Sequence, residues 1–187
     1  MAVGNAFTNQ VQNRNFLSSV GFRFTLNRAR KVSFFANQAN LPGMNLGVTE
    51  QPSYLKNIDI PGDKIAFNDF TLRFLVDENL ENYMQIHKWM RGLGYPDSLN
   101  DIFDLQVEGD NTIGYDSQSM NIYSDGTLQV VNSSNRVQFE VVFEDMFPYD
   151  LSDLQFDATS QETEYFTAEV SFKYTIYNIL TPTGDAL

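Results

Sequence analysis

Strict alternation of apolar and polar residues in four segments is the feature that most constrains how this chain folds. Successive side chains of a β-strand point to opposite faces of a sheet, so a period of two indicates a strand with one buried face. The alternating segments span residues 22–27, 70–76, 136–144 and 164–177. The composition favours the same half-buried surfaces, because 16 Phe and 9 Tyr occur among 187 residues. The sequence therefore predicts a mainly β fold in one domain.

Turn-forming residues separate further strands in the first half of the chain. A strand over residues 31–37 is expected to form a hairpin with the first strand, through a turn at residues 28–30. Strands over residues 54–60 and 64–76 are expected to flank a second turn, because the Pro-Gly-Asp sequence at residues 61–63 is typical of turns.

Residues 79–92 are expected to form one amphipathic helix. Asp77 suits the cap that precedes a helix, and Gly92 followed by Pro96 ends it. The apolar residues of this segment fall on one broad arc of a helical wheel, which predicts that one face packs on the sheet. The arc comprises Leu80, Tyr83, Met84, Ile86, His87, Met90 and Leu93. Because His87 lies within the arc, we interpret it as a packed histidine of the core or of an interface.

Several polar or irregular segments complete the chain. Residues 1–19 contain four Asn and two Gln and are expected to be an arm that orders on contact with a neighbour. Residues 109–134 are expected to be an irregular insertion with an Asp-Gly turn near residue 125. A short strand is expected over residues 102–108, and a single turn or short helix over residues 147–154. The expected organisation is an N-terminal arm (1–19), one domain (20–180) and a C-terminal tail (181–187).

The segment over residues 41–52 contains two Pro and two Gly, which are typical of a loop. Its apolar residues Leu41, Met44, Leu46 and Val48 are nevertheless too many for a loop that only meets water. Long loops in compact domains are uncommon and usually functional. Two interpretations stay open: the loop folds back on its own domain, or it reaches onto another subunit. We prefer the second.

Charge is unevenly distributed along the chain. Residues 1–60 carry six Lys/Arg and two Asp/Glu, whereas residues 97–187 carry two Lys/Arg and seventeen Asp/Glu. Three interpretations stay open: an acidic surface that aids solubility, complementarity between subunits, and a wall that repels a polyanion. Binding of a nucleic-acid duplex through its phosphates is disfavoured, because such binding requires clustered Lys and Arg.

Few residues are suited to catalysis or metal binding. One His and no Cys leave no histidine metal pair, no thiolate site and no choice of nucleophile–histidine arrangement. Adjacent carboxylates at residues 77–78 and 144–145 are explained by capping and solvation rather than by acid–base chemistry. A loose group of oxygen ligands at residues 108–116 does not match the spacing of a calcium-binding EF-hand. We therefore expect no enzyme activity, no cofactor, no metal site and no membrane insertion.

Three stretches, taken in order, carry a resemblance to a known family. The first, residues 34–43, is a strand that leads into Leu41-Pro42-Gly43, and the second, residues 67–78, leads into the helix that bears Trp89. The third begins at Met146-Phe147-Pro148 and ends in the last long alternating strand. In this order the chain resembles the tail tube proteins of contractile-tailed phages, whose fold is shared by the tube protein of type VI secretion.

This resemblance implies a β-barrel or sandwich of two packed antiparallel sheets with one flanking α-helix. It also implies a homohexameric ring whose subunits pool their sheets into a closed inner barrel, which removes exposed strand edges. Such rings stack inside a sheath as a conduit for DNA. The implied partners are the tail sheath, baseplate and terminator proteins. The implied location is the tail of a virion, assembled in the host cytoplasm.

Three groups of residues are expected to make the contacts between subunits. The ring-stacking loop comprises Leu41, Pro42, Gly43, Met44, Leu46, Val48, Tyr54 and Leu55. The outer helix presents Tyr83, His87 and Trp89. Charge contacts are expected from Arg28, Arg30, Lys31, Glu144 and Asp145.

Two other functions remain as alternatives. A baseplate tube-initiator or tail-completion protein shares the fold but forms a single ring that does not polymerise. A carbohydrate-binding β-sandwich is also rich in aromatic residues, but it exposes them on one face, whereas most aromatic residues of this chain alternate inward.

Overall fold

The computed structural model describes residue 17 and residues 21–94, 96–98, 100, 122–132, 134–156 and 165–186. These residues are mainly in strands, as the alternation predicts. In chain order the elements are β1 (Phe22–Leu26), α1 (Arg30–Phe34), β2 (Ala36–Ala39), β3 (Met44–Gln51), β4 (Ile58–Phe67), β5 (Phe70–Leu75), α2 (Glu81–Gly94), β6 (Ser124–Val131), β7 (Val137–Leu151), β8 (Thr167–Lys173) and β9 (Ile176–Leu180).

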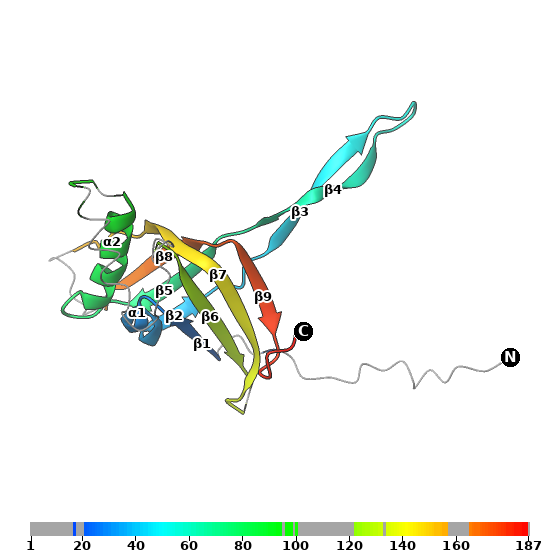
Figure 1. Ribbon diagram of the computed structural model, residues 1–187. Coiled ribbons are helices and arrows are strands. Elements are labelled where there is room, and N and C mark those ends of the chain that lie inside the picture. Colours follow the sequence, from blue (N-terminus) through cyan, green and yellow to red (C-terminus); the bar gives the residue numbers. More distant parts are fainter. Residues whose placement is uncertain are drawn as a thin grey trace.

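Two antiparallel layers form the body of the protein, and the long strand β7 belongs to both (Figure 1). In the first layer, the first part of β7 pairs with β6 on one side and with β9 on the other, and β6 also pairs with β1. In the second layer, the last part of β7 pairs with β8, which pairs with β5, which pairs with β2. The expectation of two packed antiparallel sheets is confirmed. Among the described residues the barrel is not closed, because β1 and β2, the end strands, are not hydrogen-bonded to each other.

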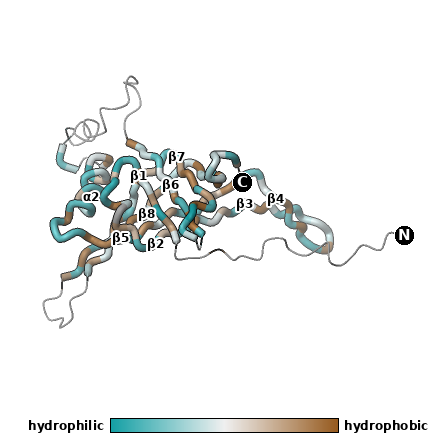
Figure 2. The backbone as a smooth tube through the Cα atoms, turned by 90° about the horizontal axis from the view of Figure 1, so that it is seen from below, coloured by the Kyte–Doolittle hydropathy of each residue, from teal (hydrophilic) through white to brown (hydrophobic). Residues whose placement is uncertain are grey.

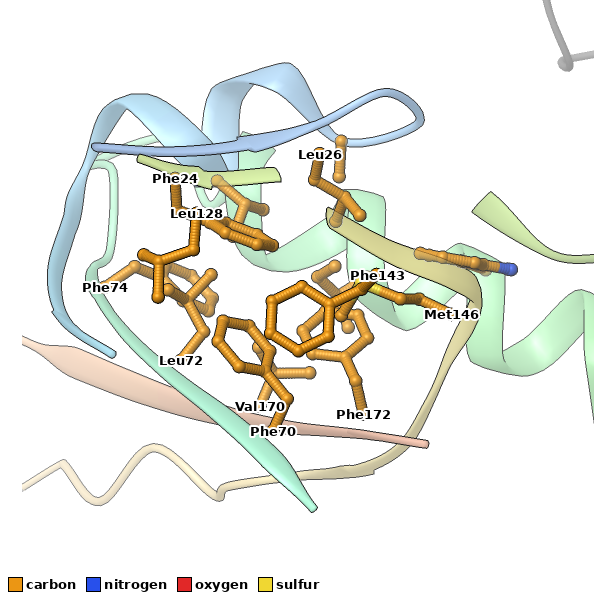
Figure 3. Packing of buried hydrophobic residues seen from close by; sticks show 14 of the residues in the cluster. Phe24, Leu26, Phe70, Leu72, Phe74, Leu128, Phe143, Met146, Val170 and Phe172 are labelled. Carbon is orange, nitrogen blue, oxygen red and sulfur yellow. The ribbon is translucent and has the colours of Figure 1, made fainter. Parts of the chain in front are cut away.

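Aromatic rings fill the space between the two layers (Figure 3). The ring of Phe70 on β5 lies 4.9 Å from Phe24 on β1 and 4.7 Å from Phe143 on β7, measured between centroids. Each such aromatic pair contributes about 0.5–1.5 kcal/mol beyond the burial of its area. The buried apolar residues alternate along β1, β5 and β8, so the predicted inward faces of these strands are confirmed.

Helix α2 packs on this core through the face that carries Asn82, Ile86 and Trp89. The Trp89 indole donates a hydrogen bond of 2.9 Å to the carbonyl oxygen of Ile122, and its ring lies 6.2 Å from that of Phe172. The predicted helix is therefore confirmed, and one of its faces packs on the core as expected. The buried face is, however, rotated about the helix axis relative to the predicted apolar arc. His87 is exposed, so its interpretation as a packed residue within this subunit is wrong.

The rotation of α2 has a local cause in the side chain of Asn82. Its amide nitrogen donates to the carbonyl oxygen of Leu75 at 2.7 Å, and its amide oxygen accepts from the backbone nitrogens of Asp77 and Tyr83. A buried polar side chain requires such partners. Asn82 therefore lies on the buried face of α2, where a helical wheel based on hydrophobicity does not place a polar residue.

The predicted hairpin at residues 28–30 is wrong. Residues Arg30–Phe34 form helix α1, and its neighbour Ala29 and its member Val32 are buried three positions apart, a helical spacing. The Ser33 hydroxyl accepts a hydrogen bond of 2.8 Å from the backbone nitrogen of Leu26, which draws α1 against β1. Consequently β1 pairs with β6, and β2 pairs with β5.

The predicted turn at residues 61–63 is also wrong, because β4 runs through it without interruption. The turn lies instead at residues 52–57, and most of the predicted loop is strand β3. The predicted strand over residues 64–76 is divided between β4 and β5, with a break at Asn68 and Asp69.

Three further expectations in the second half of the chain need correction. Regular strand β6 begins at Ser124, where an irregular segment with a turn is expected, and β7 continues through Pro148, where a short helix is expected. The long last strand is two strands, because the chain leaves β8 at Tyr174 and β9 pairs with β7 rather than extending β8. The expected strand over residues 102–108 and, apart from residue 17, the N-terminal arm lie outside the described residues.

Replacement of Phe70 by Ala tests the aromatic contact between the layers. Because the side chain is fully buried, the change should lower the free energy of unfolding by about 3–5 kcal/mol, measured by urea denaturation. Phe156 is 76% exposed, so the matched variant Phe156→Ala should change stability by less than about 0.5 kcal/mol. Similar losses in both variants would contradict the described core.

Candidate assembly interface

Strands β3 and β4 leave the body together as a projecting hairpin, residues 44–67 (Figure 1). Among the strands that the structure describes they pair only with each other, and every residue of β3 is exposed. An isolated two-stranded hairpin is at best marginally stable in water. Away from its base, the hairpin is therefore a segment whose faces the other described residues do not cover.

Apolar residues occur along both strands of this hairpin, and Figure 2 shows them as brown stretches of the backbone tube. The exposed ones are Met44, Leu46, Val48, Tyr54, Leu55, Ile58, Ile60 and Ile65. Met44 lies opposite Phe67 and Leu46 lies opposite Ile65, so these four share one face. At the tip, Tyr54 is 100% exposed and Leu55 is 90% exposed. Exposed apolar surface that is gathered in one segment is typical of interaction sites.

A close approach of two glycines shapes the hairpin. The pairing register shifts between Leu46 and Val48. Leu46 pairs with Ile65 and Val48 pairs with Pro61, so two steps along β3 correspond to four steps along β4. There, a Cβ atom added to Gly62 would lie only 2.6 Å from the carbonyl oxygen of Gly47. Only glycine fits such a contact, which explains why residues typical of a turn occur inside a strand.

The structure gives the predicted ring-stacking residues different environments. Pro42 is buried at the base of the hairpin, whereas Leu41, Gly43 and the predicted members within the hairpin are exposed. Exposed Ile58, Ile60 and Ile65 are absent from the predicted contact residues, because they lie on the return strand, which the sequence predicts to be divided by a turn. The alternation of Ile58 and Ile60 with the polar residue Asp59 is the sequence signal that indicates an apolar face on this strand.

An ion pair and a tyrosine lie beside the base of the hairpin. Lys173 forms an ion pair with Asp69, and the Tyr149 hydroxyl donates a hydrogen bond to the other oxygen of the same carboxylate. The Lys173 ammonium also lies 5.2 Å from the centre of the Tyr149 ring. The hydrogen bonds from Lys173 and Tyr149 hold the pKa of Asp69 below its ordinary value. The hydrogen bond with Asp69 raises the pKa of Lys173 and of Tyr149.

Three of the residues expected to make charge contacts are engaged within the subunit. Lys31 pairs with Glu81 on α2, and the Arg28 guanidinium lies 5.3 Å from the centre of the Trp89 ring. Glu144 accepts a hydrogen bond from Asn178 and is exposed, as are Asp145 and Arg30. These contacts do not test a role between subunits, which stays a prediction.

The residues expected on the outer helix separate into two environments. Tyr83 and His87 line a groove of about 470 Å³ together with Met90, Arg91, Gly94, Pro96 and Leu151. Trp89 is 1% exposed and points into the core, so its side chain is not available to a partner. Within the described ranges, no three His, Cys, Asp or Glu side chains are grouped as a metal site, and no helix is long and apolar enough to span a membrane.

Acid should weaken the contacts of Asp69. Because its folded pKa is lowered, the stabilisation is fully present above the unfolded value of about 3.9 and is lost as pH falls through the folded value. Parent and Asp69→Asn should therefore differ in denaturation midpoint at pH 7, and the difference should shrink as pH falls below about 4. The difference should be small, since the contacts are exposed.

The control for this measurement is Asp59→Asn, a substitution of another exposed carboxylate on the hairpin. Its difference from the parent should not depend on pH in the way that the difference of Asp69→Asn does. A gap between parent and Asp69→Asn that stays constant from pH 7 to pH 3 would contradict the assigned contacts.

Comparison with known proteins provides the context for this geometry. A family model described as phage tail tube protein matches residues 3–180. The tail tube terminator protein of Enterobacteria phage T4 is 24% identical to this chain over 175 residues, which cover 91% of this chain and 89% of the relative.

Solved structures of contractile injection systems contain similar chains. A chain of the anti-feeding prophage cap, described as the tube-terminating cap, has a TM-score of 0.56 at 15% identity and covers 95% of this chain and 99% of its own. A chain of the extended PVC sheath–tube complex has a TM-score of 0.55 at 15% identity and covers 90% and 93%. Because the family model spans nearly the whole sequence, this chain belongs to the phage tail tube protein family and is a structural protein related to tail tubes and their terminators.

Proposed function

We propose that this chain forms a ring in line with the tail tube of a contractile tail, and that the projecting hairpin attaches this ring to the next one. The observation that carries the proposal is the apolar surface on both strands of the hairpin, which its own subunit leaves exposed. A neighbouring ring that covers Met44, Leu46 and Ile65 removes this surface from water, which stabilises the contact by about 25 cal/mol per Å² of apolar area.

Unpaired strand edges support the closure of a ring. In the described body, β1 and β2 each pair on one side only, and β9 pairs with β7 alone apart from a single bridge between Leu180 and Ala186. Exposed edges tend to pair with other chains, and lateral pairing between subunits satisfies them. Head-to-tail contacts of one kind close into a ring when the rotation is right. Six subunits are proposed, because a chain of similar fold occurs in the six-fold symmetrised baseplate of the anti-feeding prophage, with a TM-score of 0.55 at 11% identity and coverage of 90% and 97%.

The position of a tube terminator is favoured over that of a repeating tube subunit. The curated relative that spans most of both chains is a tail tube terminator. In this position the ring sits on the last tube ring, within a virion tail whose other components include the sheath and the baseplate. A repeating tube subunit is the second candidate, favoured by the similarity to a chain of the PVC sheath–tube complex.

The acidic second half of the chain suits a conduit for DNA. Residues 97–187 carry seventeen Asp/Glu against two Lys/Arg. Like charges repel, so a wall with this excess does not hold phosphates during passage. In this role the protein acts through shape and charge and performs no chemistry.

Replacing two apolar residues of the hairpin tests its role in docking. Met44 and Leu46 are 61% and 44% exposed, so Met44→Asp combined with Leu46→Asp should leave the subunit folded. Docking onto tube ends should weaken at least about tenfold, since each 1.4 kcal/mol of lost contact is a factor of ten. The measurement is the fraction of purified tubes capped at a series of protein concentrations. Phe156→Asp, at an exposed apolar residue outside the hairpin, should cap tubes as the parent does; equal capping by all three chains would refute the role.

Negative-stain microscopy of the purified chain separates the two candidate positions. A terminator should give single rings at high protein concentration and low salt, whereas a repeating tube subunit should give stacked tubes. A preparation that contains monomers and no rings under these conditions would count against the formation of a ring.

A further inference from the structure

We propose that Tyr174 and Tyr177 are positioning residues that hold the projecting hairpin in one direction, ready for docking. The role in docking rests on the proposed function, whereas the hold on the hairpin does not. Each tyrosine donates a hydrogen bond to the backbone at a different leg of the hairpin. The Tyr177 hydroxyl binds the carbonyl oxygen of Pro42 at 3.2 Å, and the Tyr174 hydroxyl binds the carbonyl oxygen of Asn68 at 2.8 Å.

These two acceptors flank the hairpin on its two sides. Pro42 precedes β3, and Asn68 follows β4. The legs are joined by a hydrogen bond of 2.9 Å from the backbone nitrogen of Asn68 to the carbonyl oxygen of Gly43. A bond to one leg alone would leave the hairpin free to pivot about it. Bonds to both legs fix its direction relative to the body.

The tyrosine rings add packing to these hydrogen bonds. Phe67, the last residue of β4, has its ring centroid 6.0 Å from that of Tyr174 and 5.4 Å from that of Tyr177. Both tyrosine rings also contact Phe143, at 5.1 Å and 5.9 Å. Phe143 is fully buried on β7 and lies opposite Tyr177 in the pairing with β9. The hairpin is therefore anchored to the core through rings on rigid elements.

The chemistry of the phenols suits a permanent contact. Burial raises the pKa of Tyr174 to about 12, with smaller contributions from Tyr177 and Asp69. The hydroxyl therefore stays protonated and remains a donor throughout the physiological range. A rigid segment that is already in its docking direction loses less conformational entropy on binding than a mobile one.

Distance measurements between spin labels test whether the tyrosines hold the hairpin. The chain has no cysteine, so Tyr54→Cys at the tip and Gln138→Cys on β7 provide two unique labelling sites, both exposed. The parent should give a narrow distance distribution. Tyr174→Phe combined with Tyr177→Phe keeps the rings and removes both hydroxyls, so the distribution should widen, roughly twofold. A distribution as narrow as that of the parent would overturn the proposal.

The matched control is Tyr83→Phe, because the Tyr83 hydroxyl also donates to a backbone carbonyl, that of Ser152 at 3.1 Å, but on α2. This variant should keep the narrow distribution. If Tyr83→Phe widens the distribution as much as the double variant does, the loss of any tyrosine hydrogen bond to the backbone loosens the fold. The specific role of Tyr174 and Tyr177 in holding the hairpin is then wrong.

Capping of tube ends then tests whether the direction matters for docking. The double phenylalanine variant should cap tubes roughly tenfold less tightly than the parent, although its apolar contact residues are unchanged. A wider distribution with unchanged capping would overturn the docking role. A parent that gives a narrow distribution and caps no tubes would instead refute the proposed function while leaving the hold on the hairpin established.

Discussion

The passage of β7 from one sheet into the other is the constraint on which the rest of the structure depends. This strand of 15 residues pairs with β6 and β9 in one layer and with β8 in the other. Because one chain segment serves both layers, their inner faces meet and their aromatic rings interdigitate. The same strand carries Phe143, which connects this core to the tyrosines at the base of the projecting hairpin.

The packed body fixes the base of the projecting hairpin and so determines how its apolar residues are presented. A long exposed hairpin with apolar residues on its strands is prone to aggregate unless a partner covers it. Its base is fixed by backbone bonds, aromatic packing and the Asp69 contacts, so its apolar face is presented in one direction. The proposed function therefore relies on exposed surfaces and strand edges, which is consistent with membership of a family of tail tube proteins.

The sequence predicts the parts of this fold whose signals are local. Alternation identifies the inward faces of β1, β5 and β8, and a helical wheel identifies α2. The apolar content of residues 41–55 predicts an adhesive segment, and the structure leaves six large hydrophobic side chains exposed there: Leu41, Met44, Leu46, Val48, Tyr54 and Leu55. These inferences need no knowledge of which segments meet in space.

Other features depend on contacts that the sequence does not display. Proline within β4 is tolerated because the hairpin is exposed. Gly62 is required by its close contact with Gly47. The sequence of this strand therefore resembles that of a turn. Likewise, Gly126 on β6 makes room for Met146, since a Cβ atom there would lie 2.5 Å from the sulfur. Asn82 is buried because it binds the backbone at the end of β5, which rotates α2 and leaves His87 exposed.

A cryo-EM reconstruction of this chain on the end of its tail tube tests the central claim most directly. Each projecting hairpin should lie against the adjacent ring, with Met44, Leu46 and Ile65 covered and with the hairpin in the direction that it has in the free subunit. Hairpins that extend into solvent without touching the neighbouring ring would contradict it.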